Sequence, residues 1–169
     1  MAITAIPVNN ADHFAKGGVR KIEIADYTTG GQNITYTPAT NVAAGTLGSN
    51  IVTVEFEKES ASMAISSTSE LTGMQTHTIT VEGYIPDITN DKLEALQQLL
   101  DSPLVIKVYT WDGVEYLVGW EESSSYSASH TEFPAVLSTL ETATGSALSD
   151  QNGCSLTFTC MQVHLPATF

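Results

Sequence analysis

The sequence predicts a mainly β protein: an antiparallel β-sandwich or barrel-like domain with one short amphipathic α-helix and long loops. Three observations predict this class. Several segments alternate apolar and polar residues, β-branched Thr is abundant, and only one segment has helical periodicity. A chain of 169 residues fits one domain. We therefore expect a single β-rich domain over residues 1–169, with a flexible N-terminal segment over about residues 1–17.

Four segments have the alternation of a strand with one buried face, namely residues 19–27, 50–58, 75–85 and 153–164. Residues 135–142 form a weaker candidate strand. In each segment, polar side chains such as Lys21 and Glu23 lie opposite the apolar ones. The side chains expected inside are Ile22 and Ile24; Val52, Val54 and Phe56; His77, Ile79 and Val81; and Cys154, Leu156, Phe158 and Cys160.

The one helical segment covers about residues 90–101. Its leucines at positions 93, 96, 99 and 100 lie on one stripe. Thr89 or Asn90 can cap the N-terminus, and Pro103 favours an end shortly before it. A single stripe of this length can cover one face or edge of a sheet.

A hairpin is expected after the helix. Two alternating runs, 105–111 and 114–120, flank Asp112 and Gly113. An Asp-Gly pair between such runs predicts a type I′ turn.

The two cysteines, Cys154 and Cys160, lie six residues apart in one predicted strand. Six residues of strand rise about 20 Å. A disulfide requires Cα atoms within about 7 Å. We therefore expect two buried thiols rather than a bridge.

Long stretches of small polar residues separate the predicted elements, at 28–49, 59–74, 121–130 and 143–153. Loops beyond about 12–15 residues are uncommon in compact domains. Because these stretches are almost free of Lys, they suit flat packing against another subunit. The subunit-interface candidates are Gly30, Gly31, Asn33, Thr35, Tyr36, Ala44, Leu47, Trp111 and Trp120.

The charge balance is strongly acidic, with 6 Lys and Arg against 19 Asp and Glu and a net charge of −13. No Lys or Arg follows Lys107. Such a surface repels polyanions, which argues against nucleic-acid binding and against an anionic membrane. The first residues lack the basic and apolar regions of a secretory signal, so we expect no export and no membrane partner.

Catalytic motifs are not apparent. The serines at 123–125, 127 and 129 beside His130 lack a nameable orienting carboxylate. Glu55 and Glu57 would share a strand face about 7 Å apart, a spacing that suits a cation or acid–base pair, although a solvated strand face is the favoured interpretation. Trp111 and Trp120 suit core or interface packing better than sugar stacking. We expect no catalytic residue, no metal site and no cofactor.

The order of these features resembles the tail tube proteins of bacteriophages. The shared features are a β-rich chain, a single short amphipathic helix followed by a strand hairpin, long small-residue loops and an acidic balance. Residues 114–125 and 145–160 also resemble stretches of small structural proteins of phage virions. The resemblance implies a homo-oligomeric, hexameric ring that stacks into a tube, with strands of every subunit in an inner β-barrel.

The same resemblance implies a lumen that passes DNA without specific binding, other virion proteins as partners, and a location in the virion after synthesis in the host cytoplasm. An acidic and hydroxyl-rich lumen would suit this passage. The lumen-facing candidates are Glu55, Glu57, Thr78, Thr80 and Glu82.

Three alternatives remain open at this stage. A head–tail connector would form one ring and stop, and a capsid decoration protein would bind a capsid surface. A β-sandwich carbohydrate-binding module would stay monomeric and use Trp111 or Trp120.

Overall fold

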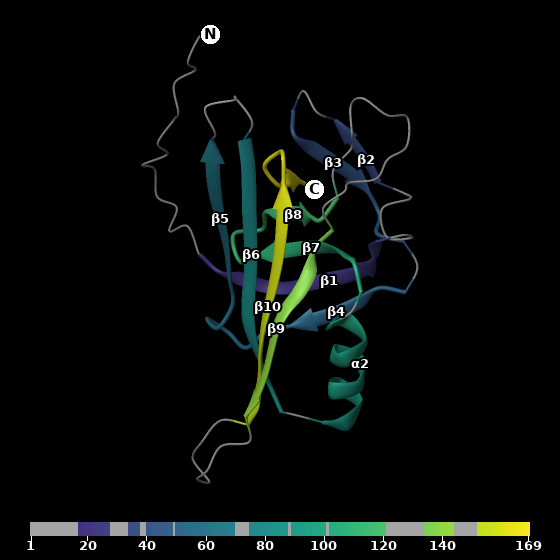
Figure 1. Ribbon diagram of the computed structural model, residues 1–169, viewed down its shortest axis with the longest axis vertical. Coiled ribbons are helices and arrows are strands. Elements are labelled where there is room, and N and C mark those ends of the chain that lie inside the picture. The colour runs from purple at the N-terminus through teal and green to yellow at the C-terminus, as the bar shows by residue number, and fades with distance from the viewer. Residues whose placement is uncertain are drawn as a thin grey trace.

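The computed structural model describes residues 17–27, 34–37, 40–48, 50–69, 75–87, 89–100, 102–120, 134–143 and 152–169 (Figure 1). The predicted flexible segment at 1–17 lies outside this part, apart from Gly17. The described elements are β1 (Val19–Asp26), β2 (Ile34–Thr37), β3 (Val42–Gly45), β4 (Val52–Glu55), β5 (Ser62–Ser69), β6 (Gln75–Pro86), α2 (Asn90–Leu100), β7 (Leu104–Thr110), β8 (Glu115–Val118), β9 (Val136–Ala143), β10 (Gly153–Gln162) and β11 (Ala167–Thr168).

The strands form two sheets. Sheet A has the order β2-β3-β11-β8-β7-β1-β4, and sheet B has the order β5-β6-β10-β9. Every pairing is antiparallel except the short contact between β3 and β11. In Figure 1 the strands of sheet B run vertically in front of β1, β4 and β7, which cross behind them. The predicted class, a mainly β sandwich-like domain with one short helix, is confirmed.

Alternation of apolar residues accounts for the packing of sheet B. On β6, His77, Ile79 and Val81 are buried, while Thr78 and Thr80 between them are half-buried on the opposite face. β10 repeats the pattern, and the two strands pair along ten residues, so their buried residues share one face. That face of sheet B packs against sheet A.

The main core lies between the two sheets. Sheet A contributes Ile22, Ile24 and Ile106, and sheet B contributes Ile79 and Phe158, all almost completely buried. Burial of such a side chain contributes about 1.5–3 kcal/mol each. Helix α2 covers one end of this core through Leu96 and Leu99. Thr89 caps the helix, because its Oγ1 accepts a hydrogen bond from the Lys92 N–H at 3.4 Å.

A corner joins the two sheets beside the start of β7. The backbones of Leu104 and Ala135 exchange two hydrogen bonds of 2.8 and 2.9 Å. Gly119 lies against this pair with a φ of +80°. A Cβ there would lie 2.7 Å from both the Ala135 nitrogen and the Leu104 oxygen, so only Gly fits. The corner therefore fixes the position at which the chain enters sheet B beside sheet A.

A second, smaller core lies on the other face of sheet A. Val105 and Leu117 point there, and the β2–β3 hairpin covers them with Ile34 and Ala43. Trp120 completes this core, only 5% exposed, with its ring 6.0 Å from that of Tyr27. Sheet A is thus packed on both faces, whereas sheet B is packed on one.

Two sequence predictions are corrected by this fold. The stretches 28–49 and 59–74 were expected to be loops, yet they contain β2, β3 and β5. These strands lack clear alternation, because they carry small or polar residues on both faces. The Asp112–Gly113 turn is also not type I′, which requires positive φ at both residues. Only Gly113 has it, at +87°, in a three-residue loop closed by Gly113 N–H donating to the Thr110 oxygen at 3.3 Å.

The corner predicts a difference between two glycines that share a positive φ. Replacing Gly113 by Ala should cost about 1 kcal/mol of unfolding free energy, because nothing lies within 4 Å of the new Cβ and only backbone strain opposes it. Gly119→Ala should cost about 2 kcal/mol more, because its Cβ meets backbone atoms. Urea denaturation measures both values. Equal losses would show that the corner tolerates displacement.

Candidate functional site

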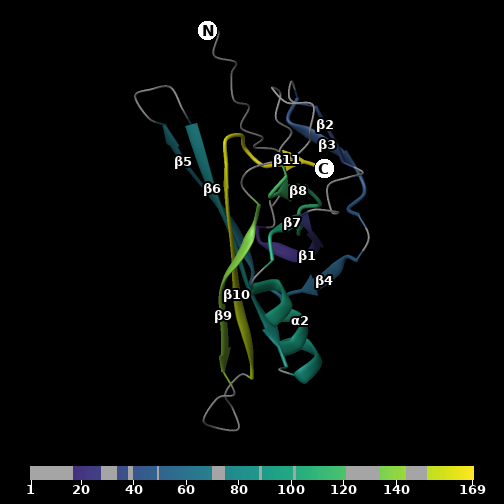
Figure 2. The ribbon, with the colours of Figure 1, turned by 45° about the vertical axis from the view of Figure 1, so that its right-hand side comes forward.

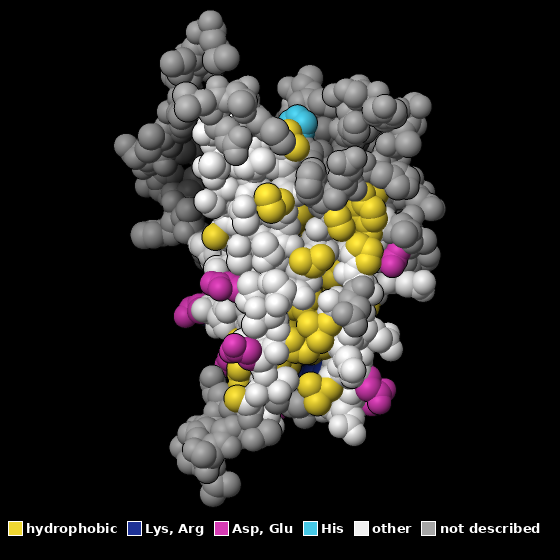
Figure 3. Space-filling model, viewed as in Figure 1, with side chains coloured by type: hydrophobic (Ala, Val, Ile, Leu, Met, Phe, Trp, Pro, Cys, Tyr) yellow, Lys and Arg dark blue, Asp and Glu magenta, His cyan; other side chains and the backbone are white. Residues whose placement is uncertain are grey.

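The outer face of sheet B is a sheet surface that carries many polar side chains. On β6 it presents Thr78, Thr80 and Glu82, and on β10 it presents Thr157 and Thr159. Thr80 pairs with Thr159 and Glu82 with Thr157 across the two central strands. Figure 3 views this face, where uncharged side chains and backbone lie beside a column of hydrophobic side chains and carboxylates lie at the margins.

Hydrogen bonds order the hydroxyl groups of this face. Ser138 Oγ donates to the Thr157 oxygen at 2.9 Å and lies 2.9 Å from Thr159 Oγ1. On the other side, Ser62 Oγ donates to Glu82 Oε1 at 3.1 Å. None of the four strands contains Lys or Arg. The outer face of sheet B is therefore a neutral to acidic surface whose strands carry no cation.

Each edge strand of sheet B pairs with a single strand within the described residues, and α2 lies close to β9. β5 pairs only with β6, and β9 pairs only with β10. Each edge exposes an apolar residue: Ile65 on β5 is 41% exposed and Val136 on β9 is 42% exposed. Figure 2 shows the β5–β6 pair extending away from sheet A at its upper end. Open edges with exposed apolar side chains are sites where another chain adds a strand.

An apolar strip accompanies the β9 edge. Val136 and Met161 lie on the outer face there, and Val163 and Leu165 follow the end of β10. All four are exposed, Met161 at 51%. Exposed large apolar residues in such numbers at one edge are typical of an interaction site rather than of free surface.

The structure separates the five predicted lumen residues. Thr78, Thr80 and Glu82 lie together on the outer face of sheet B. Glu55 instead lies on β4, the edge strand of sheet A, paired with Lys21. Glu57 follows that strand, and its N–H donates to the Tyr84 oxygen at 3.0 Å where the sheets meet. One sheet face therefore does not carry all five.

The sequence prediction did not select Thr157 and Thr159, although the sequence contains a signal for them. The alternation of residues 153–164 already places them opposite the buried Leu156 and Phe158. The contribution of β5 had no such signal, because its Ser-rich sequence does not alternate.

The predicted interface residues fall into several environments. Thr35 and Ala44 are exposed on the β2–β3 hairpin, and Trp111 is 39% exposed. Leu47 and Trp120 are buried in the second core, so residues of the same chain already cover them. Tyr36 lies in β2, and its side chain is not described; Gly30, Gly31 and Asn33 lie outside the described residues.

Two of the described cations, Lys21 and Lys107, are held in ion pairs on sheet A. Lys107 contacts Glu115 at 2.8 Å and lies over the Phe169 ring, and Lys21 contacts Glu23 at 2.7 Å. Tyr109 OH also donates to Glu23 at 2.7 Å. Burial alone would raise the pKa of the Glu23 carboxyl, but the hydrogen bonds from Lys21 and Tyr109 and the nearby Lys charges hold that pKa below its usual value. Burial and the bond to Glu23 raise the pKa of Tyr109.

No group of three or more His, Cys, Asp or Glu side chains able to hold a metal occurs among the described residues. Both cysteines are free and buried, as predicted. No helix of the described chain is long and apolar enough to cross a bilayer. Comparisons of the chain with family models, with curated proteins and with solved structures gave no match.

The Glu23 network predicts a pH-dependent stability. Glu23→Gln should lower the unfolding free energy by about 1 kcal/mol at pH 7, because it removes charge-assisted hydrogen bonds from Lys21 and Tyr109. Since the folded pKa is depressed, this stability is present above the unfolded pKa of about 4.3 and is lost as pH falls through the folded pKa. Urea denaturation at pH 7 and pH 3 measures the difference.

The control is Glu141→Gln on exposed β9. A loss from Glu23→Gln that is the same at both pH values would contradict this account.

Proposed function

We propose that this protein is a non-enzymatic structural subunit that assembles with copies of itself into a ring, with the outer face of sheet B lining the lumen. One observation carries the proposal: a cation-free sheet face rich in Ser and Thr lies between two open edge strands. A protein that acts alone usually blunts or covers such edges. Here both edges offer backbone groups and an exposed apolar residue.

Ring closure follows from the position of the edges. β5 and β9 lie at opposite ends of one sheet, so β5 of one copy can meet β9 of the next. Contacts of this head-to-tail kind close into rings when the rotation allows it. A closed ring leaves neither edge of sheet B exposed. Together with the family resemblance, this supports a hexameric ring that stacks as a phage tail tube in the virion.

The lumen chemistry suits passing DNA. Glu82 and Glu141 repel phosphate, and the hydroxyls of Thr80 and Thr157 carry no charge. Cations that would bind phosphate and slow transit lie on sheet A and α2 instead. The proposal therefore moves the wall from Glu55 to Thr157 and Thr159 while keeping Thr78, Thr80 and Glu82.

Two other assemblies share this support. A head–tail connector would use the same edges in a single ring, and a capsid decoration protein would use the apolar strip on a capsid surface. A carbohydrate-binding module is supported only by the exposed Trp111, because Trp120 is buried in the second core.

The exposed apolar residues on edge strands β5 and β9 predict which substitutions prevent ring assembly. Ile65→Lys and Val136→Lys should each prevent the closed ring, because a charge on an edge strand opposes addition of another strand. Val42→Lys is the matched control, since Val42 is 40% exposed but lies in sheet A. Sedimentation velocity measures the oligomers. The proposal would be wrong if all three variants assembled alike.

The lumen wall predicts a contrast between two identical charge changes. Glu82→Lys should make the assembled protein bind duplex DNA at least ten times more tightly, because every subunit adds a cation to the lumen. Glu94→Lys should leave binding unchanged, because Glu94 is exposed on α2 and lies outside sheet B. Co-sedimentation with linear DNA at low salt measures both. Equal effects would place the wall elsewhere.

A further inference from the structure

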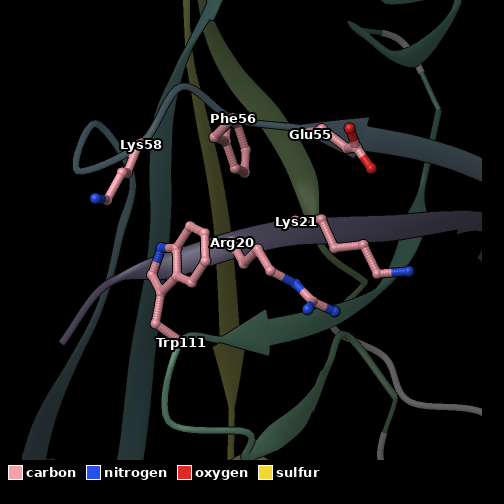
Figure 4. A pocket seen from close by; sticks show the side chains of 6 residues that line it. All are labelled: Arg20, Lys21, Glu55, Phe56, Lys58 and Trp111. Carbon is pink, nitrogen blue, oxygen red and sulfur yellow. The ribbon is translucent and has the colours of Figure 1, made fainter. Parts of the chain in front are cut away.

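A shallow recess on sheet A gathers three of the chain's six cations around an exposed indole. It has a volume of about 460 Å³ and is lined by Arg20, Lys21, Glu55, Phe56, Lys58 and Trp111 (Figure 4). Phe56 forms part of the floor and is 9% exposed, whereas Trp111 is 39% exposed. The recess lies where β1 begins, β4 ends and the β7–β8 turn passes.

The cations of the recess differ in how far they are neutralised. Lys21 is held by Glu23, and Lys58 lies 4.0 Å from Glu59 on a fully solvated surface. Arg20 makes no ion pair within the described residues. Glu55 supplies the single carboxylate of the lining. The recess is thus a positive, aromatic-lined spot on a protein whose net charge is −13, which suits an acidic peptide with aromatic residues.

One segment of this chain has the matching composition. Residues 121–133 carry Glu121, Glu122 and Glu132 without any Lys or Arg, together with Tyr126 and Phe133. The other stretches between described elements carry at most one carboxylate each, apart from the N-terminal residues, which also include Lys16. Charge complementarity therefore selects 121–133 as the occupant.

Chain geometry favours the segment of another copy. Both flanks of 121–133 lie at the first end of β7, because Val118 pairs with Ile106 and Ala135 with Leu104. Trp111 lies beyond the other end, and seven residues of strand separate them by about 20 Å. Thirteen residues span at most about 45 Å, so a segment returning to its start reaches about 22 Å. Only the middle of the segment could then reach the recess of its own chain, whereas Glu121, Glu122 and Glu132 lie near its two ends.

We propose that the Trp111 recess binds residues 121–133 of a second copy of this chain. The recess and the flanks of the segment lie at opposite ends of β7, so the contact is head-to-tail and adds a second link between copies beside the sheet B edges. The inference rests on the proposed self-assembly, and it names the surface that joins one copy to the next outside the sheet.

The first test is binding of a fluorescein-labelled peptide of residues 121–133, measured by anisotropy. The receptor is the full chain carrying Glu121→Gln, Glu122→Gln and Glu132→Gln, so that its own segment competes weakly. Arg20→Glu with Lys58→Glu should weaken binding at least tenfold. Lys92→Glu is the matched control, an exposed cation outside the recess, and should leave affinity unchanged. Equal affinities in the recess and control variants would overturn the proposal.

If the chain with Arg20→Glu and Lys58→Glu does not fold, variants that only remove the two charges provide the test. Arg20→Gln with Lys58→Gln should weaken binding in the same direction with an unchanged circular dichroism spectrum. A peptide with all three Glu changed to Gln should bind at least tenfold more weakly. A neutral peptide that binds equally well would overturn the role of charge.

A cysteine cross-link tests whether the contact joins two copies. A chain with Lys58→Cys mixed with a chain with Glu122→Cys should give a covalent heterodimer on oxidation, and replacing the first by Lys92→Cys should not. A Lys58→Cys, Glu122→Cys chain that gives only bridged monomers would overturn the proposal.

These assays separate this inference from the proposed ring. Peptide binding needs no assembly, so it should survive in the Ile65→Lys chain. Rings that form normally without peptide binding would overturn the recess alone. Peptide binding by a chain whose copies associate but never form a closed ring would keep the recess and overturn the ring.

Discussion

The structure depends on the burial of one face of sheet B against sheet A. Ile79 and Phe158 from sheet B meet Ile22 and Ile106 from sheet A in one core, and the Leu104–Ala135 corner sets how the sheets meet. Because this packing uses the inner face of sheet B, its outer face and two edges are what remain for partners. An apolar side chain at each open edge then makes association with another chain favourable.

The distribution of charge follows the same division. Sheet A holds Lys21 and Lys107 in ion pairs, and it places Arg20 and Lys58 around Trp111. The strands of sheet B contain no cation, so the charged side chains of its outer face are carboxylates only. The described residues thus form an acidic surface without cations on sheet B and a positive spot on sheet A. This separation underlies both the proposed lumen and the proposed contact between copies.

The sequence predicted the elements whose apolar residues alternate, because burial of one face imposes that period. β1, β6, β10, α2 and the buried cysteines were predicted in this way. β5 could not be, because an exposed edge strand such as Ser62–Ser69 needs no apolar face. Glu55 and Glu82 also look equivalent in sequence. Alternation gives the face of a strand but not its sheet, and the backbone pairing puts these two residues on different sheets.

Electron microscopy of the purified full chain over a concentration series, with light scattering on the same samples, tests the central claim most directly. The account predicts rings or stacked tubes whose fraction rises with concentration, since each copy offers one β5 edge and one β9 edge to its neighbours. Particles with the size of a single subunit at every concentration would contradict it.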